Sequence, residues 1–366
     1  MADRRVAEIA FRRLPLACLA AAAVAGCAVG PEATAKAAAV PWLIALAAVG
    51  LPHGAADLAV SRRLCGRESL AAVWAAYITV IVAVVAAYAL APVTVIVLFV
   101  LLSVWHFGRA HAAAEPLARP RSRLAKIGAA VARGGIALGV PLAARPRAAR
   151  EVAADLLGLT GHAADAAALS AAAVSSFGLA ILAAALVGLA CEVASTGHLA
   201  DGQRRAGRLL VELAVIALLG LVTHPLFAVG CTFLFWHAWR QMDPLAAILT
   251  GKRPDSWRSL GRSVVQIHVA ALPLLVPAWL AVGLAWWHRS ATHSCRDAAI
   301  LSIGVYLAVT APHELLDRLS RGPAGAANHR LPGLPRPKAR LQASATRARS
   351  GLAAGNAARL SPPERR

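Results

Sequence analysis

Apolar runs long enough to cross a lipid bilayer recur along most of this chain. A transmembrane helix needs about 20 mostly apolar residues to cover roughly 30 Å of hydrocarbon. Hydrophobic residues make up 58% of the 366 residues and charged residues 15%, whereas soluble domains have about 25% charged residues. The runs cover residues 13–30, 40–58, 70–90, 91–107, 126–143, 168–190, 207–222, 224–240, 264–287 and 297–313. We therefore predict an all-α fold, a polytopic transmembrane helix bundle of about 8–10 spans.

The first run, RRLPLACLAAAAVAGCAVG, has two interpretations. Its basic start, alanine-rich centre and small-residue end are typical of a cleaved signal peptide. They also fit a retained helix, which is the interpretation that we adopt.

The formal net charge is +20, and most of the charges fall between the apolar runs or in the C-terminal tail. In a soluble protein this charge would suggest nucleic acid, but here it fits the positive-inside rule. With a cytoplasmic N-terminus, ten spans place the strongly basic connections around Arg62, Arg109, Arg204 and Arg240 on the cytoplasmic side. We predict a plasma-membrane protein with both termini cytoplasmic, with the lipid bilayer and no nucleic acid as a partner.

The chain changes character near residue 318, where it becomes rich in Arg, Pro, Ala and Gly. Such a segment has too few large apolar side chains to bury a core. We predict a transmembrane helical domain with a metal site over residues 1–317, and a basic disordered cytoplasmic tail over 318–366 near anionic headgroups. The six cysteines are scattered without a CxxC pair, so the sequence indicates neither a zinc knuckle nor a disulfide framework.

Four of the twelve histidines share one predicted depth in the membrane. His53, His106, His237 and His313 lie at the cytoplasmic ends of the second, fourth, eighth and tenth runs. A single histidine near a helix end is more often an interfacial or capping residue. Ionisable side chains at membrane depth are costly, however, and imidazoles from separate helices suit iron, copper or zinc. We predict these four histidines as metal ligands.

Carboxylates and aromatic residues accompany these histidines in the sequence. Asp57 follows His53 by one helical turn and Glu314 is adjacent to His313, so both are candidates to orient a ligand imidazole. The aromatic residues near His106 and His237 fit either an interfacial belt or the walls of a groove for a flat conjugated substrate. These residues are Trp105, Phe107, Phe233, Phe235, Trp236 and Trp239.

The remaining histidines fit other roles. His111 lies among basic residues, which favours a surface position, and His224 should lie at the opposite membrane face from His237, since 13 residues of helix rise about 20 Å. His268 has a suitable depth and is a reserve ligand. The others lie in predicted loops or the tail: His162, His198, His288, His293 and His329.

The segments GLPHGAAD, WHFG, HPLFAVGCTFLFWHAWR and APHELLD resemble the motifs of the Brp/Blh family of membrane β-carotene 15,15′-dioxygenases, over residues 45–317. The resemblance implies a non-haem Fe(II) (Fe²⁺) enzyme that uses O₂ to split the central double bond of β-carotene into two all-trans-retinal molecules. It also implies a functional link to a rhodopsin. The family's ligand positions carry over to His53, His106 and His237, and the fourth falls on Gln241.

Gln241 departs from the H-x-x-x-H pair of the family, in which both imidazoles lie on one helix face. A neutral amide oxygen is a poor Fe(II) ligand. Three outcomes are open: a three-histidine site, a fourth ligand such as His313 or His268, or loss of activity. A second departure is Arg109, which stands after the HFG motif where the resemblance implies an acidic residue.

Other functional classes remain as hypotheses. The protein could bind haem between paired histidines, or it could be a non-catalytic relative that handles opsin, retinal or carotenoid. A transporter is a weaker hypothesis, because matching halves with interrupted helices are missing from the sequence. The chain shows neither a Ser/His/Asp nor a Cys/His arrangement for nucleophilic catalysis.

Overall fold

The computed structural model describes residues 6–64, 67–114, 122–162, 164–196, 202–289 and 293–321. Within these ranges the chain is helical and contains no strand. Eight helices there are long and apolar enough to cross a membrane, which confirms the predicted helix bundle. They are Val6–Lys36, Val40–Arg63, Leu70–Leu90, Pro92–Ala113, Arg123–Ala144, Ala171–Ala194, Trp257–Arg289 and Cys295–Asp317.

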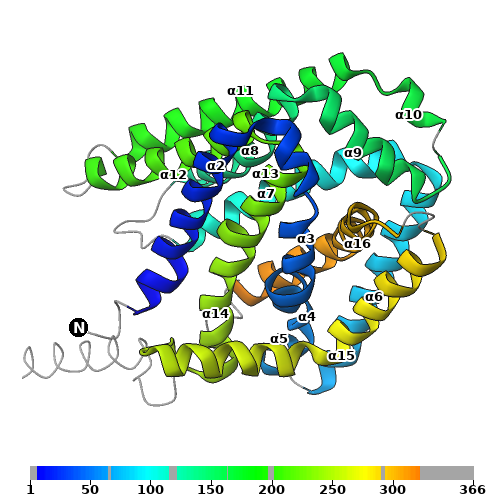
Figure 1. Cartoon of the computed structure of the whole chain (residues 1–366). Helices are drawn as coiled ribbons and strands as arrows, with labels where there is room; N and C mark the ends of the chain where they lie inside the picture. The colour runs from blue at the N-terminus through cyan, green and yellow to red at the C-terminus, as the bar shows by residue number, and fades with distance from the viewer. Residues whose placement is uncertain are drawn as a thin grey trace, which may run out of the picture. The chain divides into compact units, whose positions relative to one another are not determined.

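The elements follow one another with short connections. In chain order they are η1 (Ile9–Arg13), α2 (Leu14–Lys36), α3 (Val40–Ile44), η2 (Ala45–Val49), α4 (Gly50–Ala55), α5 (Asp57–Leu64), α6 (Arg67–Leu90), α7 (Pro92–Ala114), α8 (Arg123–Ala144), α9 (Pro146–Gly158), α10 (Asp165–Ala168), α11 (Ala171–Thr196), α12 (Gly202–Val222), α13 (Pro225–Cys231), η3 (Thr232–Ala238), α14 (Trp239–Thr250), α15 (Trp257–Arg289) and α16 (Cys295–Arg321). The segments η1, η2 and η3 are π-helical. In Figure 1, α3, α4 and α16 lie centrally, with α2 and α14 on one side and α6 on the other, and α15 runs along the bottom of the view from the side of α14 to that of α6.

Two of the ten predicted runs are not among the eight candidate spans. The run at 207–222 lies in α12, whose first half also carries three arginines and Glu212. The run at 224–240 is divided among α13, the π-helix η3 and α14, which continues to Thr250.

The last helix, α16, extends to Arg321, past the predicted domain limit at residue 317. The prediction of a disordered tail lies outside the described residues from position 322 onward.

The N-terminal helix is packed into the bundle. A Cβ on Gly26 would lie 2.3 Å from the Thr223 side chain, so α2 and α12 are in close contact. The Thr34 hydroxyl accepts a hydrogen bond of 2.9 Å from the His224 backbone N–H. Trp239 donates to the Ala10 carbonyl at 2.7 Å. These contacts fit the interpretation of this segment as a helix of the bundle.

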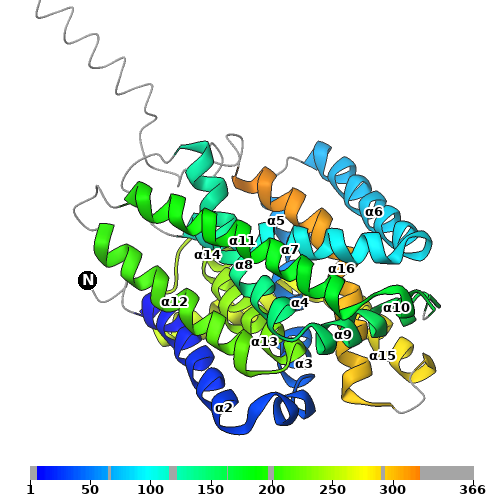
Figure 2. The same ribbon diagram turned by 90° about the horizontal axis from the view of Figure 1, so that it is seen from above.

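Glycines allow α7 and α8 to approach at backbone distance. A Cβ on Gly108 would lie 1.7 Å from the Ala130 carbonyl oxygen, and a Cβ on Gly134 would lie 1.8 Å from that of Val104. Small residues at membrane helix interfaces permit such close packing. On its other side α8 packs against α11, as Figure 2 shows. The α7–α8 contact fixes the position of α7, which carries His106.

Gly108→Ala should therefore destabilise the bundle by about 1–3 kcal/mol, since a methyl group would force α7 from α8. The expected result is a lower Tm of the purified protein in detergent and a lower yield of folded protein. Gly283→Ala in α15 is the control, because a Cβ there meets no atom within 4 Å. Equal Tm values for the two variants would contradict the role of Gly108.

Candidate metal centre

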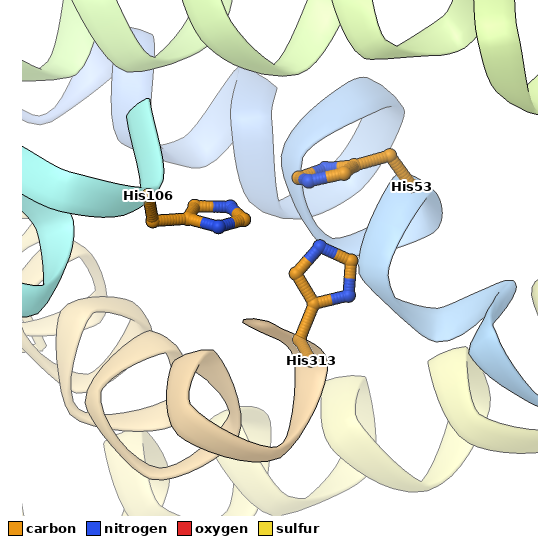
Figure 3. Close-up of side chains that lie close together, drawn as sticks. All are labelled: His53, His106 and His313. Atoms are coloured by element: carbon orange, nitrogen blue, oxygen red, sulfur yellow. The ribbon is translucent and has the colours of Figure 1, made fainter. Parts of the chain in front are cut away.

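Three histidines from three different helices converge inside the bundle. His53 comes from α4, His106 from α7 and His313 from α16, and one ligand nitrogen from each lies within 4.8 Å of the others. Figure 3 shows the three rings turned toward one another. His53 and His106 are buried and His313 is partly buried. A buried group of three imidazoles with this spacing could hold a metal ion.

His237 lies directly beside this group. Its ring centroid is 4.7 Å from that of His106 and 5.5 Å from that of His53, and its side chain is fully buried. The ring also stacks on Phe107 at 4.3 Å. His237 belongs to η3, and single π-helical turns frequently occur at functional sites. The structure thus brings all four predicted histidines into one region, with three of them in the tightest group.

Unpartnered nitrogens in this region fit a metal donor set. Neither ring nitrogen of His237 has a hydrogen-bond partner, and the same holds for Nε2 of His53. A buried polar atom left unpaired costs about 1–3 kcal/mol. Lone pairs that coordinate an ion need no hydrogen-bond donor, so these residues fit a metal better than a purely structural polar cluster.

The histidines that the two carboxylates bind differ from those that sequence proximity suggested. Nδ1–H of His106 donates to Glu314 Oε2 at 2.7 Å, and Nδ1–H of His313 donates to both Asp57 oxygens at 2.9 Å. The sequence suggested Asp57 for His53 and Glu314 for His313. Adjacent residues on a helix point about 100° apart, so Glu314 and His313 face different neighbours. Each bond holds the imidazole in the tautomer whose Nε2 can bind a metal.

Further donors hold the two carboxylates in place. Arg109 donates to both oxygens of Glu314 at 3.0 and 2.8 Å and also pairs with Asp317. Trp105 donates to Glu314 at 3.0 Å. Tyr77 donates to Asp57 at 3.0 Å. The arginine after the HFG motif therefore has its acidic partners on α16.

The prediction of a surface position for His111 is wrong. α7 continues to Ala114, beyond the predicted end of the fourth span at residue 107, so His111 stays inside the bundle and is buried. Its ring stacks on Trp236 at 3.6 Å with an interplanar angle of 6° and lies 6.0 Å from the His237 ring. Trp236 is fully buried and donates to Glu212, which also pairs with Arg240. Sequence reasoning missed His111 because basic residues nearby resembled a loop.

A cavity of about 300 Å³ adjoins the histidines, and all four of them line it. Most of the other lining side chains are apolar or aromatic. Among the aromatic residues singled out from the sequence, Phe107 and Phe233 line the cavity, and their rings stack at 5.9 Å. Trp105, Phe235, Trp236, Trp239 and Gln241 are not among its lining residues. Sequence motifs gave no signal for the other aromatic residues of the cavity, which are Trp42, Trp74, Tyr77, Phe99 and Tyr306.

The remaining histidines in the described part of the chain do not line this cavity. His268 hydrogen-bonds through Nδ1 to the Val264 carbonyl of its own helix at 2.8 Å. His224 caps the N-terminus of α13 by accepting from the Leu226 N–H. His162 hydrogen-bonds to Thr160, and His293 stacks on Trp287. His198 and His329 lie outside the described residues.

Comparison with known proteins points to one family. Residues 44–319, which include all four histidines, match the family model described as beta-carotene 15,15′-dioxygenase. The chain belongs to this family. A similar protein is the probable beta-carotene 15,15′-dioxygenase Blh of Halobacterium salinarum, which is 30% identical over 297 residues, 74% of this chain and 81% of the relative. No solved structure matches this member of the beta-carotene 15,15′-dioxygenase family.

Asp57→Asn should lower the affinity of the centre for a divalent first-row metal about 10-fold or more, because a carboxylate that accepts from a ligand imidazole orients the ring and raises its basicity. Titration of the purified protein with the metal measures the change. Asp297→Asn is the control, because Asp297 lies in the first turn of α16, about four helical turns before His313. Affinity that is equal in both variants would contradict the orienting role of Asp57.

Proposed function

We propose that this protein is an Fe(II)-dependent dioxygenase that cleaves β-carotene at its central 15,15′ double bond with O₂. One oxygen atom enters each half, so the products are two all-trans-retinal molecules and no other oxidant is needed. The observation that carries the proposal is the convergence of three imidazoles within 4.8 Å at the wall of an apolar cavity. Membership of the β-carotene 15,15′-dioxygenase family supports the same reaction.

In this proposal His53, His106 and His313 hold the iron, and His237 is the fourth ligand. A bound Fe(II) would supply the redox chemistry that lets O₂ react with a closed-shell polyene. His313 offers the imidazole that Gln241 lacks, and its bond to Asp57 holds a proton on Nδ1 and leaves Nε2 as the atom that faces the metal. The proposed ligand set therefore still has four imidazoles, although position 241 is a glutamine.

The grouping of three nitrogens favours a non-haem ion over haem. A porphyrin fills the four in-plane positions around its iron and leaves two axial positions. If two of these histidines bound a haem iron from opposite faces, the third imidazole nitrogen, within 4.8 Å of both, would clash with the porphyrin ring.

The cavity supports an apolar, extended substrate. About 300 Å³ is at the lower end of ligand pockets, so we propose that it takes the central part of the polyene while the two ends lie outside. Phe107 and Phe233 would pack on the polyene and exclude water. Ile78 of α6 lines the cavity and is 54% exposed, which supports entry of the substrate from the lipid.

The apolar substrate supports a location in the membrane. β-Carotene dissolves in the bilayer, and the basic connections favour a plasma-membrane protein with both termini in the cytoplasm. Retinal released into this membrane would be available to a rhodopsin, which is the functional link that we propose.

Expression in a bacterial host that makes β-carotene tests the reaction. We expect the native protein to yield retinal and bleach the yellow colour, and His53→Ala to yield none. His268→Ala is the matched control, because His268 bonds within its own helix, and it should retain activity. Gln241→His should change the yield less than twofold. Absence of retinal with the well-expressed native protein, but not with Gln241→His, would instead indicate a family member that has lost its reaction.

Entry from the lipid predicts a steric effect on one face of α6. Ile78→Trp should lower kcat/KM for β-carotene about 10-fold or more, because a larger side chain would narrow the cavity. Val82→Trp is the control: Val82 is 61% exposed on the same helix but is not a lining residue. Assays in detergent and metal analysis distinguish blocked entry from a lost ion, and an equal effect of both variants would argue against this entry route.

A further inference from the structure

A second groove, of about 640 Å³, lies where α5, α14 and α15 meet. Figure 1 shows the first part of α15 passing across the ends of α14 and α5. Its lining combines four cations, polar side chains and an apolar remainder. The lining residues are Ala59, Arg63, Leu249, Thr250, Lys252, Arg253, Pro254, Ser259, Arg262, Ser263, Gln266 and Ala270.

The cations of this groove are incompletely neutralised by the protein. Arg253 lies 3.7 Å from the Asp243 carboxylate. No ion pair to another described residue is found for Arg63, Lys252 or Arg262. All three are exposed at the groove. Gathering like charges raises the local positive potential, and a bound anion lowers that energy.

One face of α15 carries residues of both this groove and the histidine cavity. On α15, Ser263, Gln266 and Ala270 line the groove, and Leu274 and Ala278 line the histidine cavity. These residues recur at intervals of three or four and therefore lie on one helix face.

The facing helices repeat this arrangement. Ala55 lines the cavity, and Ala59 and Arg63 line the groove, again four residues apart. α15 packs against both α4 and α5. The basic groove and the apolar histidine cavity thus follow one another along a seam between α4–α5 and α15.

We propose that this seam binds an anionic membrane phospholipid. The phosphate would lie among Arg63, Lys252 and Arg262, where charge-assisted hydrogen bonds are available. One acyl chain would follow Ala59 and Ala270 toward the histidine cavity. The position supports a lipid rather than a soluble anion, because Arg63 and Trp257 are at the ends of two candidate spans and polybasic segments there attract anionic headgroups. This proposal stands independently of the cleavage reaction.

Thermal unfolding of the full-length protein in neutral detergent tests the proposal. We expect phosphatidylglycerol to raise Tm more than phosphatidylcholine, and Arg63→Gln/Arg262→Gln to weaken phosphatidylglycerol binding at least 10-fold. Arg62→Gln/Arg258→Gln is the matched control: it removes the same charge from the same two helices, and neither residue lines the groove. It should bind the lipid as the native protein does. Native mass spectrometry counts the retained lipids.

Three outcomes would overturn the proposal. Equal losses in the two double variants would mean general electrostatic attraction without a site. A Tm increase of the same size with inorganic phosphate alone would mean a soluble-anion site. Equal retention of phosphatidylcholine and phosphatidylglycerol would show that the cations of the groove do not select an anionic headgroup. If Arg63→Gln/Arg262→Gln unfolds without lipid, Lys252→Gln in the loop after α14 makes the same test.

Discussion

The histidine centre depends on two carboxylate–imidazole pairs that join different helices. Asp57, at the start of α5, binds His313 of α16, and Glu314 of α16 binds His106 of α7. Each bond fixes an imidazole and also ties two helices together. Because Glu314 and His313 are neighbours on α16, a shift of that helix would disturb two of the three rings at once. Arg109 adds a further tie between α7 and α16. The geometry of the centre and the packing of its helices are therefore one property of the fold.

How much of this arrangement the sequence predicts depends on the range of the interaction. Helices, their approximate bounds and the depth of His53, His106 and His313 follow from local hydropathy, which each segment carries by itself. The pairing of Asp57 with His313 and of Glu314 with His106 does not, because it depends on how helices rotate about their axes when they pack. A residue adjacent in sequence was the natural candidate partner, yet on a helix that residue points to another neighbour.

The π-helix η3 determines where His237 and its neighbours point, which local sequence patterns leave undetermined. An expected register of 3.6 residues per turn links His237 to the residue four positions later, Gln241. η3 covers Thr232–Ala238 and changes the register just where His237 lies, and Gln241 follows in α14. The same segment places Trp236 against His111 of α7 and Phe233 at the cavity. No hydropathy pattern marks a π-helix, because hydropathy reflects how apolar a segment is and not how many residues it has per turn.

The position of the arginine after the HFG motif illustrates how a departure from a family pattern can be neutral for the fold. Arg109 stands where the resemblance implied an acidic residue, and that change alone would leave an extra positive charge beside His106. Glu314 and Asp317 neutralise this charge from α16, one helical turn apart. In an apolar interior a lone guanidinium would be costly, and bonds to two carboxylates offset much of that cost. The pairing therefore lets Glu314 keep its bond to His106 while Arg109 and Trp105 fix its orientation. The electrostatic balance of the centre is thus set by the contact between α7 and α16 rather than by either motif alone.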